Sequence, residues 1–118
     1  MITVTLSQKN FKPNSRVKGT VTWQLNKIPK DIKVRLFWYT RGRGTEDIEL
    51  ADEVQLGADL QGQRGFDLTL PEGPYSFSGK LISLIWGVEA VVHPGGECGR
   101  EEIVVSPTGQ EIILGDKA

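Results

Sequence analysis

The sequence predicts an all-β, antiparallel protein of seven to eight strands with no substantial helix. Apolar and polar residues alternate with a period of two along most of the chain, which is the pattern of half-buried strands. All six prolines fall between these alternating segments, where a missing amide donor breaks no ladder hydrogen bond. No window shows a convincing apolar stripe at helical spacing. Many short strands separated by turn residues indicate a sandwich or a barrel.

The alternating pattern is more regular in some predicted strands than in others. It is most regular in segment 16–25, where every second residue is apolar or glycine and the residues between are polar. Segment 52–61 is the only helical candidate, and Gly57 in its middle costs about 1 kcal/mol relative to alanine in a helix, so we expect a short loop or bulge there. In chain order the predicted strands are 2–6, 16–25, 32–39, 48–56, 66–70, 82–90 and 103–105.

One hairpin can be given a register. Residues 42–44, Gly-Arg-Gly, suit a three-residue loop that would pair Arg41 with Thr45. The inner pairs are then Trp38–Ile48 and Leu36–Leu50, and the outer pairs are Tyr39–Asp47, Phe37–Glu49 and Lys33–Glu53. Strict alternation places Asp52 inward opposite Val34, where an unpaired carboxylate would be costly. We therefore predict a bulge near Asp52, or a sheet edge that lets it reach water.

The three tryptophans, Trp23, Trp38 and Trp86, all occupy the inward phase of their strands. This phase predicts that they pack in the core. A sugar-binding aromatic platform would need them on an exposed face, so their burial distinguishes a packed core from a carbohydrate module.

Size and charge exclude several classes of function. The chain has 118 residues, enough for one domain (1–118), and its formal charge of -1 favours neither nucleic acid nor an anionic membrane as a partner. The single Cys98 cannot form an internal disulfide, and no secretory signal pattern precedes Ile2, so we expect a cytoplasmic protein. No apolar run approaches the roughly 20 residues of a membrane helix, so we expect no membrane insertion.

Two motifs carry a resemblance to a known family. Residues 70–90, LPEGPYSFSGKLISLIWGVEA, are a loop punctuated by proline and glycine that leads into a long strand. Residues 11–21, FKPNSRVKGTV, are an apolar residue, a turn and then Val-x-Gly-x-Val. Together with the strand-like 32–36, they resemble the arrestin-like superfamily in order and spacing over roughly residues 11–90.

The resemblance implies a single immunoglobulin-like β-sandwich related to arrestins, retromer cargo-adaptor subunits and bacterial sporulation-control proteins. Those proteins are adaptors rather than catalysts. Arrestins carry two such sandwiches and this chain carries one, so the resemblance supplies neither their interdomain groove nor their buried charged switch. The Pro-Pro-x-Tyr motif of some members is also missing from the sequence. The resemblance therefore implies a non-enzymatic scaffold.

Few residues suggest chemistry. His93, Glu97 and Cys98 surround a glycine-rich loop, but a structural zinc takes four protein ligands and a catalytic zinc three, and the chain has only one His and one Cys. A single histidine also disfavours hydrolase arrangements. The paired glycines fit turns rather than a phosphate cradle, because no helix start follows them. We predict no enzyme activity, no metal and no cofactor.

The candidate binding face is the outward set Arg35, Phe37, Tyr39 and Arg41, continued by Lys33. Aromatic residues interleaved with cations can bind an acidic peptide, a phosphate or a single nucleic-acid strand. Acids on the paired strand would instead make this set ordinary sheet surface, with each cross-strand pair contributing about 0.2–1 kcal/mol. Self-association could equally cover the two aromatics. We expect structural surface or a protein interface here, and no nucleic acid.

We therefore predict a protein-binding adaptor or scaffold module that docks a protein partner, or a second copy as a homodimer, through strand edges or loops. An exposed edge adjoining 81–92 would allow strand addition. The alternative is a carbohydrate- or small-ligand-binding accessory sandwich, which an exposed tryptophan platform or a concave pocket would reveal.

Replacing the lone thiol (Cys98→Ser) should leave both thermal stability and partner binding intact, because we interpret its surroundings as a flexible loop. Circular dichroism melting and a pull-down from native lysate would measure the two properties. Large losses in both would contradict this interpretation.

Overall fold

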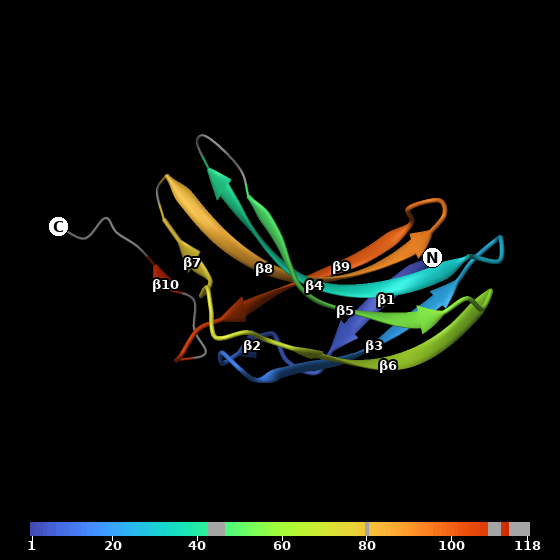
Figure 1. Cartoon of the computed structure of the whole chain (residues 1–118), viewed down its shortest axis with the longest axis horizontal. Coiled ribbons are helices and arrows are strands. Elements are labelled where there is room, and N and C mark those ends of the chain that lie inside the picture. Colours follow the sequence, from blue (N-terminus) through green and yellow to red (C-terminus); the bar gives the residue numbers. More distant parts are fainter. Residues whose placement is uncertain (43–46, 80, 109–111, 114–118) are drawn as a thin grey trace.

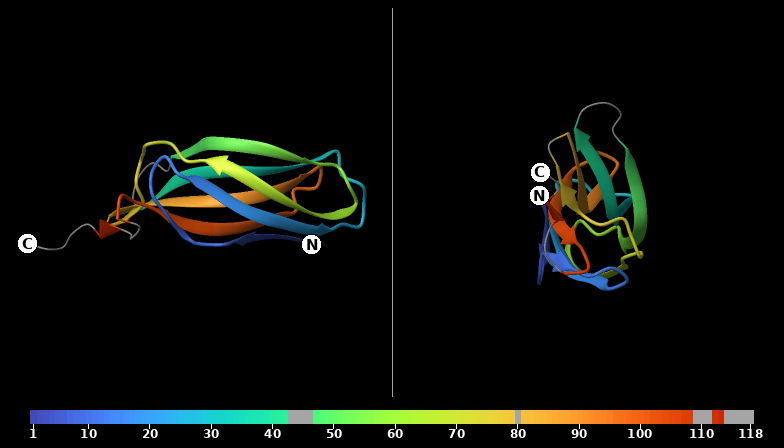
Figure 2. Two further views of the ribbon diagram at one scale, coloured as in Figure 1. Left: turned by 90° about the horizontal axis from the view of Figure 1, so that it is seen from below. Right: turned by 90° about the vertical axis from the view of Figure 1, so that its left-hand side faces the viewer.

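The computed structural model describes residues 1–42, 47–79, 81–108 and 112–113. Two β-sheets lie face to face in an elongated molecule of 54 × 29 × 18 Å (Figures 1 and 2). The described residues contain no helix, and hence none long and apolar enough to cross a membrane. The predicted all-β sandwich is confirmed.

The smaller sheet has three antiparallel strands in the order β1-β3-β6. They are β1 (Ile2–Leu6), β3 (Arg16–Gln24) and β6 (Gln61–Thr69). Their inward side chains alternate with exposed polar ones, as the period-two pattern predicts.

The larger sheet is built on four antiparallel strands in the order β9-β8-β4-β5. They are β4 (Asp31–Gly42), β5 (Ile48–Gly57), β8 (Ile82–His93) and β9 (Cys98–Val105). Three two-residue strands join them, namely β2 (Asn10–Phe11), β7 (Phe77–Ser78) and β10 (Ile112–Ile113). Among the described residues, seven strands have five residues or more, in agreement with the predicted count.

The long strand β8 itself has no open edge, because it pairs with β4 on one side and with β7 and β9 on the other. The strands around it leave open edges in the described part of the chain. Residues 98–103 of β9 pair only with β8, so this edge adjoins 81–92 as expected, and β5 pairs only with β4.

The core lies between the two sheets and contains most of the predicted inward residues. Trp23 and Trp86 are buried, and each indole Nε1 donates 2.9 Å to a loop carbonyl oxygen, that of Asp59 and that of Pro74 respectively. Trp38 is partly buried and packs against the core cluster. The described residues therefore form no tryptophan platform, and core packing is confirmed for these side chains.

The loop of the 70–90 motif crosses from β6 of the smaller sheet to β7 and β8 of the larger one. Ser76 fixes its far end to β9, because the Ser76 amide donates to the Val105 carbonyl (2.7 Å) and the Val105 amide donates to the Ser76 hydroxyl (2.9 Å). Both the Ser76 side chain and Leu70 at the start of the loop are buried. The motif thus connects the two sheets and covers one end of the core.

The predicted register of the β4–β5 hairpin is wrong. The observed pairs include Tyr39↔Ile48, Trp38↔Glu49, Phe37↔Leu50, Leu36↔Asp52 and Lys33↔Gln55. A shift of one residue moves every side chain of a strand to the opposite face. As a result Ile48 and Leu50, expected in the core, are 69% and 54% exposed. The predicted pairing of Arg41 with Thr45 lies outside the described residues.

The bulge predicted near Asp52 is confirmed, because the register shifts between Leu36 and Phe37. Asp52 points toward the smaller sheet, where one carboxylate oxygen accepts the Thr69 amide of β6 (2.8 Å) and the other accepts the Glu53 amide (2.8 Å). This carboxylate joins the two sheets along one side of the sandwich. The loop expected within 52–61 is shorter than predicted, because β5 continues to Gly57.

Asp52→Ala should lower the free energy of unfolding by about 1–3 kcal/mol, because the Thr69 amide loses its acceptor at the junction of the sheets. Urea denaturation would measure the change. Asp67→Ala is the control, since it removes an exposed ion pair with Arg16 (3.0 Å) that is worth about 0–1 kcal/mol. Equal losses for the two variants would show that Asp52 has no special role.

Candidate functional site

The larger sheet extends beyond the smaller one. The ends of β4, β5, β7 and β8 bend away together from the three-stranded sheet, as Figure 1 shows. Residues 48–51 of β5 belong to this extension, and all four are exposed. This part of β5 therefore has a free edge and two solvent-facing sides.

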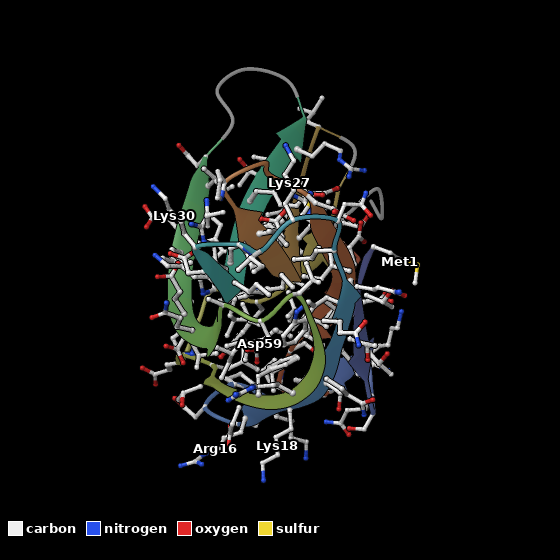
Figure 3. All side chains as sticks on the ribbon, turned by 90° about the vertical axis from the view of Figure 1, so that its right-hand side faces the viewer. Met1, Arg16, Lys18, Lys27, Lys30 and Asp59 are labelled. Carbon is white, nitrogen blue, oxygen red and sulfur yellow. The ribbon has the colours of Figure 1, made fainter. Side chains whose placement is uncertain are left out.

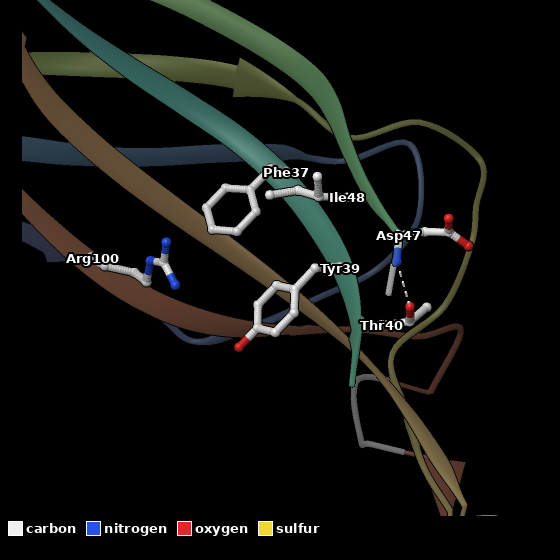
Figure 4. A pocket seen from close by; sticks show the side chains of 6 residues that line it. All are labelled: Phe37, Tyr39, Thr40, Asp47, Ile48 and Arg100. Carbon is white, nitrogen blue, oxygen red and sulfur yellow. Dashed lines mark hydrogen bonds between the residues drawn. The ribbon is translucent and has the colours of Figure 1, made fainter. Parts of the chain in front are cut away.

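Phe37 lies on β4 on the same side of the sheet as Tyr39 and Ile48 (Figure 4). Its ring stacks against Tyr39, with centroids 6.1 Å apart and planes at 19°, and the Arg100 guanidinium lies 5.0 Å from its centroid. Gly87 is its neighbour on β8, and a Cβ there would lie 2.9 Å from Phe37 Cζ. Phe37 was expected to be exposed, but its neighbours leave it only 4% exposed.

Two of the three cations of the predicted face, Arg35 and Arg41, already have partners. Arg35 Nε lies 2.9 Å from Glu53 Oε2. Arg100 of β9 was not predicted as part of this face, and its Nη2 lies 2.9 Å from Glu89 Oε2. An acid was expected opposite the cations of β4, and Glu53 takes this position. It pairs with Arg35 rather than with Lys33, its partner in the predicted register. Arg41, at the end of β4, donates to the Tyr39 hydroxyl (3.0 Å).

Two shallow hollows adjoin over Phe37. One has a volume of about 340 Å³ and the other about 260 Å³. Both are lined by Phe37, Ile48 and Arg100; Tyr39 lines the first and Leu50 the second. The hollows therefore run from the aromatic pair of β4 to the exposed apolar side chains of β5.

The hydrogen bonds of the hairpin define which backbone groups β5 leaves free. The Thr40 amide donates to the Asp47 carbonyl (2.9 Å) and the Asp47 amide donates to the Thr40 hydroxyl (2.9 Å), so the backbone groups of Thr40 and Asp47 face each other. Such pairs alternate with pairs whose N–H and C=O groups point outward. Ile48 and Leu50 therefore direct their backbone groups to the open edge.

The side of β5 opposite the hollows is acidic. Glu49 alternates with Ile48 and Leu50, so its side chain projects to the other side of the strand. Asp47 comes directly before β5 and also lines the first hollow. Both acids are exposed, and neither carboxylate forms an ion pair with a described residue. One strand thus presents an apolar side, an acidic side and a free backbone edge.

The loop between His93 and Cys98 offers no comparable site. Cys98 is exposed, and the described residues contain no group of three side chains able to hold a metal ion. Asp31 and His93 face each other across β4 and β8, and each has one buried side-chain atom without a hydrogen bond. Two such groups are too few for a metal centre.

No protein-family model and no curated protein matches the chain. Among solved structures, Spo0M, a sporulation control protein from Bacillus subtilis, is similar with a TM-score of 0.63 and 21% sequence identity over 89% of this chain. The fold is the arrestin-like β-sandwich. The resemblance inferred from residues 11–21 and 70–90 is confirmed at this level. This arrestin-like sandwich spans about half of Spo0M, since the match covers 48% of that chain.

Four residues of the candidate site were not predicted from the sequence: Ile48, Leu50, Gly87 and Arg100. The wrong hairpin register placed Ile48 and Leu50 in the core. A glycine inside a long strand often marks a close approach of another group, and this signal was available for Gly87. No local signal links Arg100 to Phe37, because their contact depends on strand order.

Gly87→Ala should lower the free energy of unfolding by about 1–3 kcal/mol, because the new Cβ would collide with the Phe37 ring. Gly65→Ala is the matched control on another strand, since its Cβ would lie 3.7 Å from the nearest atom, the Gly19 carbonyl oxygen. Thermal and urea denaturation would compare the two. If Gly65→Ala cost as much as Gly87→Ala, the packing of Phe37 on Gly87 would not explain the loss.

Proposed function

We propose that this arrestin-like sandwich is a non-catalytic protein-docking module, of the adaptor or scaffold kind, that binds an extended segment of a partner along the open edge of β5. The proposal rests on the exposure of Ile48 and Leu50 and on the direction of their backbone groups. Their side chains are 69% and 54% exposed, and their backbone groups point to the same open edge.

Natural proteins usually protect such an edge with lysine, proline, a bulge or a covering loop. Residues 48–51 contain neither lysine nor proline, and the bulge lies only at their end, beside Asp52. Strand addition satisfies the free backbone groups, and side-chain hollows then supply specificity. The hollows over Phe37 begin beside Ile48 and Leu50 and suit this purpose.

The similarity to Spo0M supports a regulatory rather than a catalytic role, since that protein is described as a sporulation control protein. The alternative of a carbohydrate-binding module has less support. Its distinguishing features were an exposed tryptophan platform or a concave pocket. Trp23 and Trp86 lie in the core, and the hollows over Phe37 are shallow. The shallow hollows remain compatible with side chains of an added strand.

The double variant Ile48→Asn, Leu50→Asn should reduce partner capture from native lysate by about tenfold or more, because it removes the apolar side of the edge. The matched control is Ile28→Asn, Leu60→Asn, which changes the same residue types at exposures of 75% and 42% elsewhere on the surface. Quantitative mass spectrometry of the captured proteins is the readout.

The control should retain the partners of the unchanged protein. The same captured set for all three proteins would rule out docking at β5. Circular dichroism would establish that each variant is folded.

A further inference from the structure

The sequence of β5 and the residues before it is strongly acidic. Residues 46–53 read EDIELADE, so five of the eight are acids. Two of these already have partners in the described structure: Glu53 pairs with Arg35, and Asp52 accepts two backbone amides. Asp47 and Glu49 carry exposed charges without an ion pair among the described residues.

The register of β5 determines which residues of an added strand would lie next to these charges. Ile48 and Leu50 would exchange backbone hydrogen bonds with it, and the partner residues opposite them would project over the hollows at Phe37. The intervening partner residues would project to the other side, next to Glu49. Apolar side chains suit the first positions, and positive side chains suit the second.

We infer that the occupant of this edge is an extended segment in which lysine or arginine alternates with apolar residues. This inference rests on the proposed docking function and adds the chemistry of the partner. Partner residues on the acidic side of β5 should be basic, because opposite charges attract. Partner residues on the side of Ile48 and Leu50 should be apolar, because that surface is apolar.

Charge also argues against a second copy of this chain as the occupant. An antiparallel pairing of two β5 edges with Ile48 opposite Ile48 or Leu50 would place Glu49 of one copy opposite Asp47 or Glu49 of the other, and like charges in opposite positions destabilise a sheet. The neighbouring residues of β4 on this side are Leu36, Trp38 and Thr40, so they supply no cation to offset the repulsion.

Three synthetic peptides test the inference. They are Lys-Val-Lys-Val-Lys-Val, a block peptide of the same composition (Lys-Lys-Lys-Val-Val-Val), and Glu-Val-Glu-Val-Glu-Val. Fluorescence anisotropy of labelled peptides should give the alternating basic peptide an affinity about tenfold or more above that of the block peptide, with no measurable binding of the acidic peptide. Added salt should weaken the alternating complex.

A charge reversal provides the decisive comparison. Glu49→Lys should invert the preference, so that the acidic peptide binds better than the basic one, whereas Glu49→Gln should weaken basic-peptide binding without inversion. Asp59→Lys is the control: it adds the same two units of positive charge in the turn between β5 and β6 (Figure 3) and should leave the preference unchanged. Glu49 is exposed, so both of its variants should fold, as circular dichroism would verify.

Equal binding of the alternating and block peptides would overturn the inference, because it would indicate only general attraction between opposite charges. Light scattering that finds a dimer dissociated by Leu50→Asn would overturn it in favour of a second copy. If partner capture depends on Ile48 and Leu50 but the alternating basic peptide does not bind, the docking function stands and the basic–apolar occupant is wrong.

Discussion

The twelve-residue pairing of β4 with β8 is the interaction on which the rest of the structure depends. Its ladder runs from Asp31↔His93 to Gly42↔Ile82 without a bulge. One end supplies the middle of the core, including the fully buried Val34 and Val88. The other end continues past the smaller sheet, and β5 extends beside it because β5 pairs with β4 (Figure 1). One rigid ladder therefore provides stability at one end and an accessible surface at the other.

The sequence predicts a strand wherever one side of the strand is buried and the other is exposed to solvent. Segments 16–25 and 82–90 alternate because the pleat turns every second side chain toward the opposite sheet. The pairing of β4 with β5 could not be predicted in this way, because alternation gives the phase of each strand but not its alignment with a neighbour. A small change in alignment moved Ile48 and Leu50 from the expected core to the surface.

The candidate site combines residues from four strands, so the sequence revealed only part of it. Alternation correctly places Phe37 and Tyr39 on the outer phase of β4. The burial of Phe37 depends on Gly87 of β8 and Arg100 of β9, which strand order brings beside it. The acids of 46–53 are plain in the sequence, but the side of the strand that Glu49 occupies becomes visible only with the correct register.

The bulge at Asp52 divides β5 into two stretches under different packing constraints. After it, Leu56 is buried and Val54 packs against the core, so most replacements there cost stability. Before it, residues 48–51 are exposed and contribute little to the core. Mutations in this first stretch therefore alter the chemistry of the surface at little cost to the core. The fold can tolerate many different side chains at 48–51, whereas positions 54 and 56 must keep apolar residues that fit between the sheets.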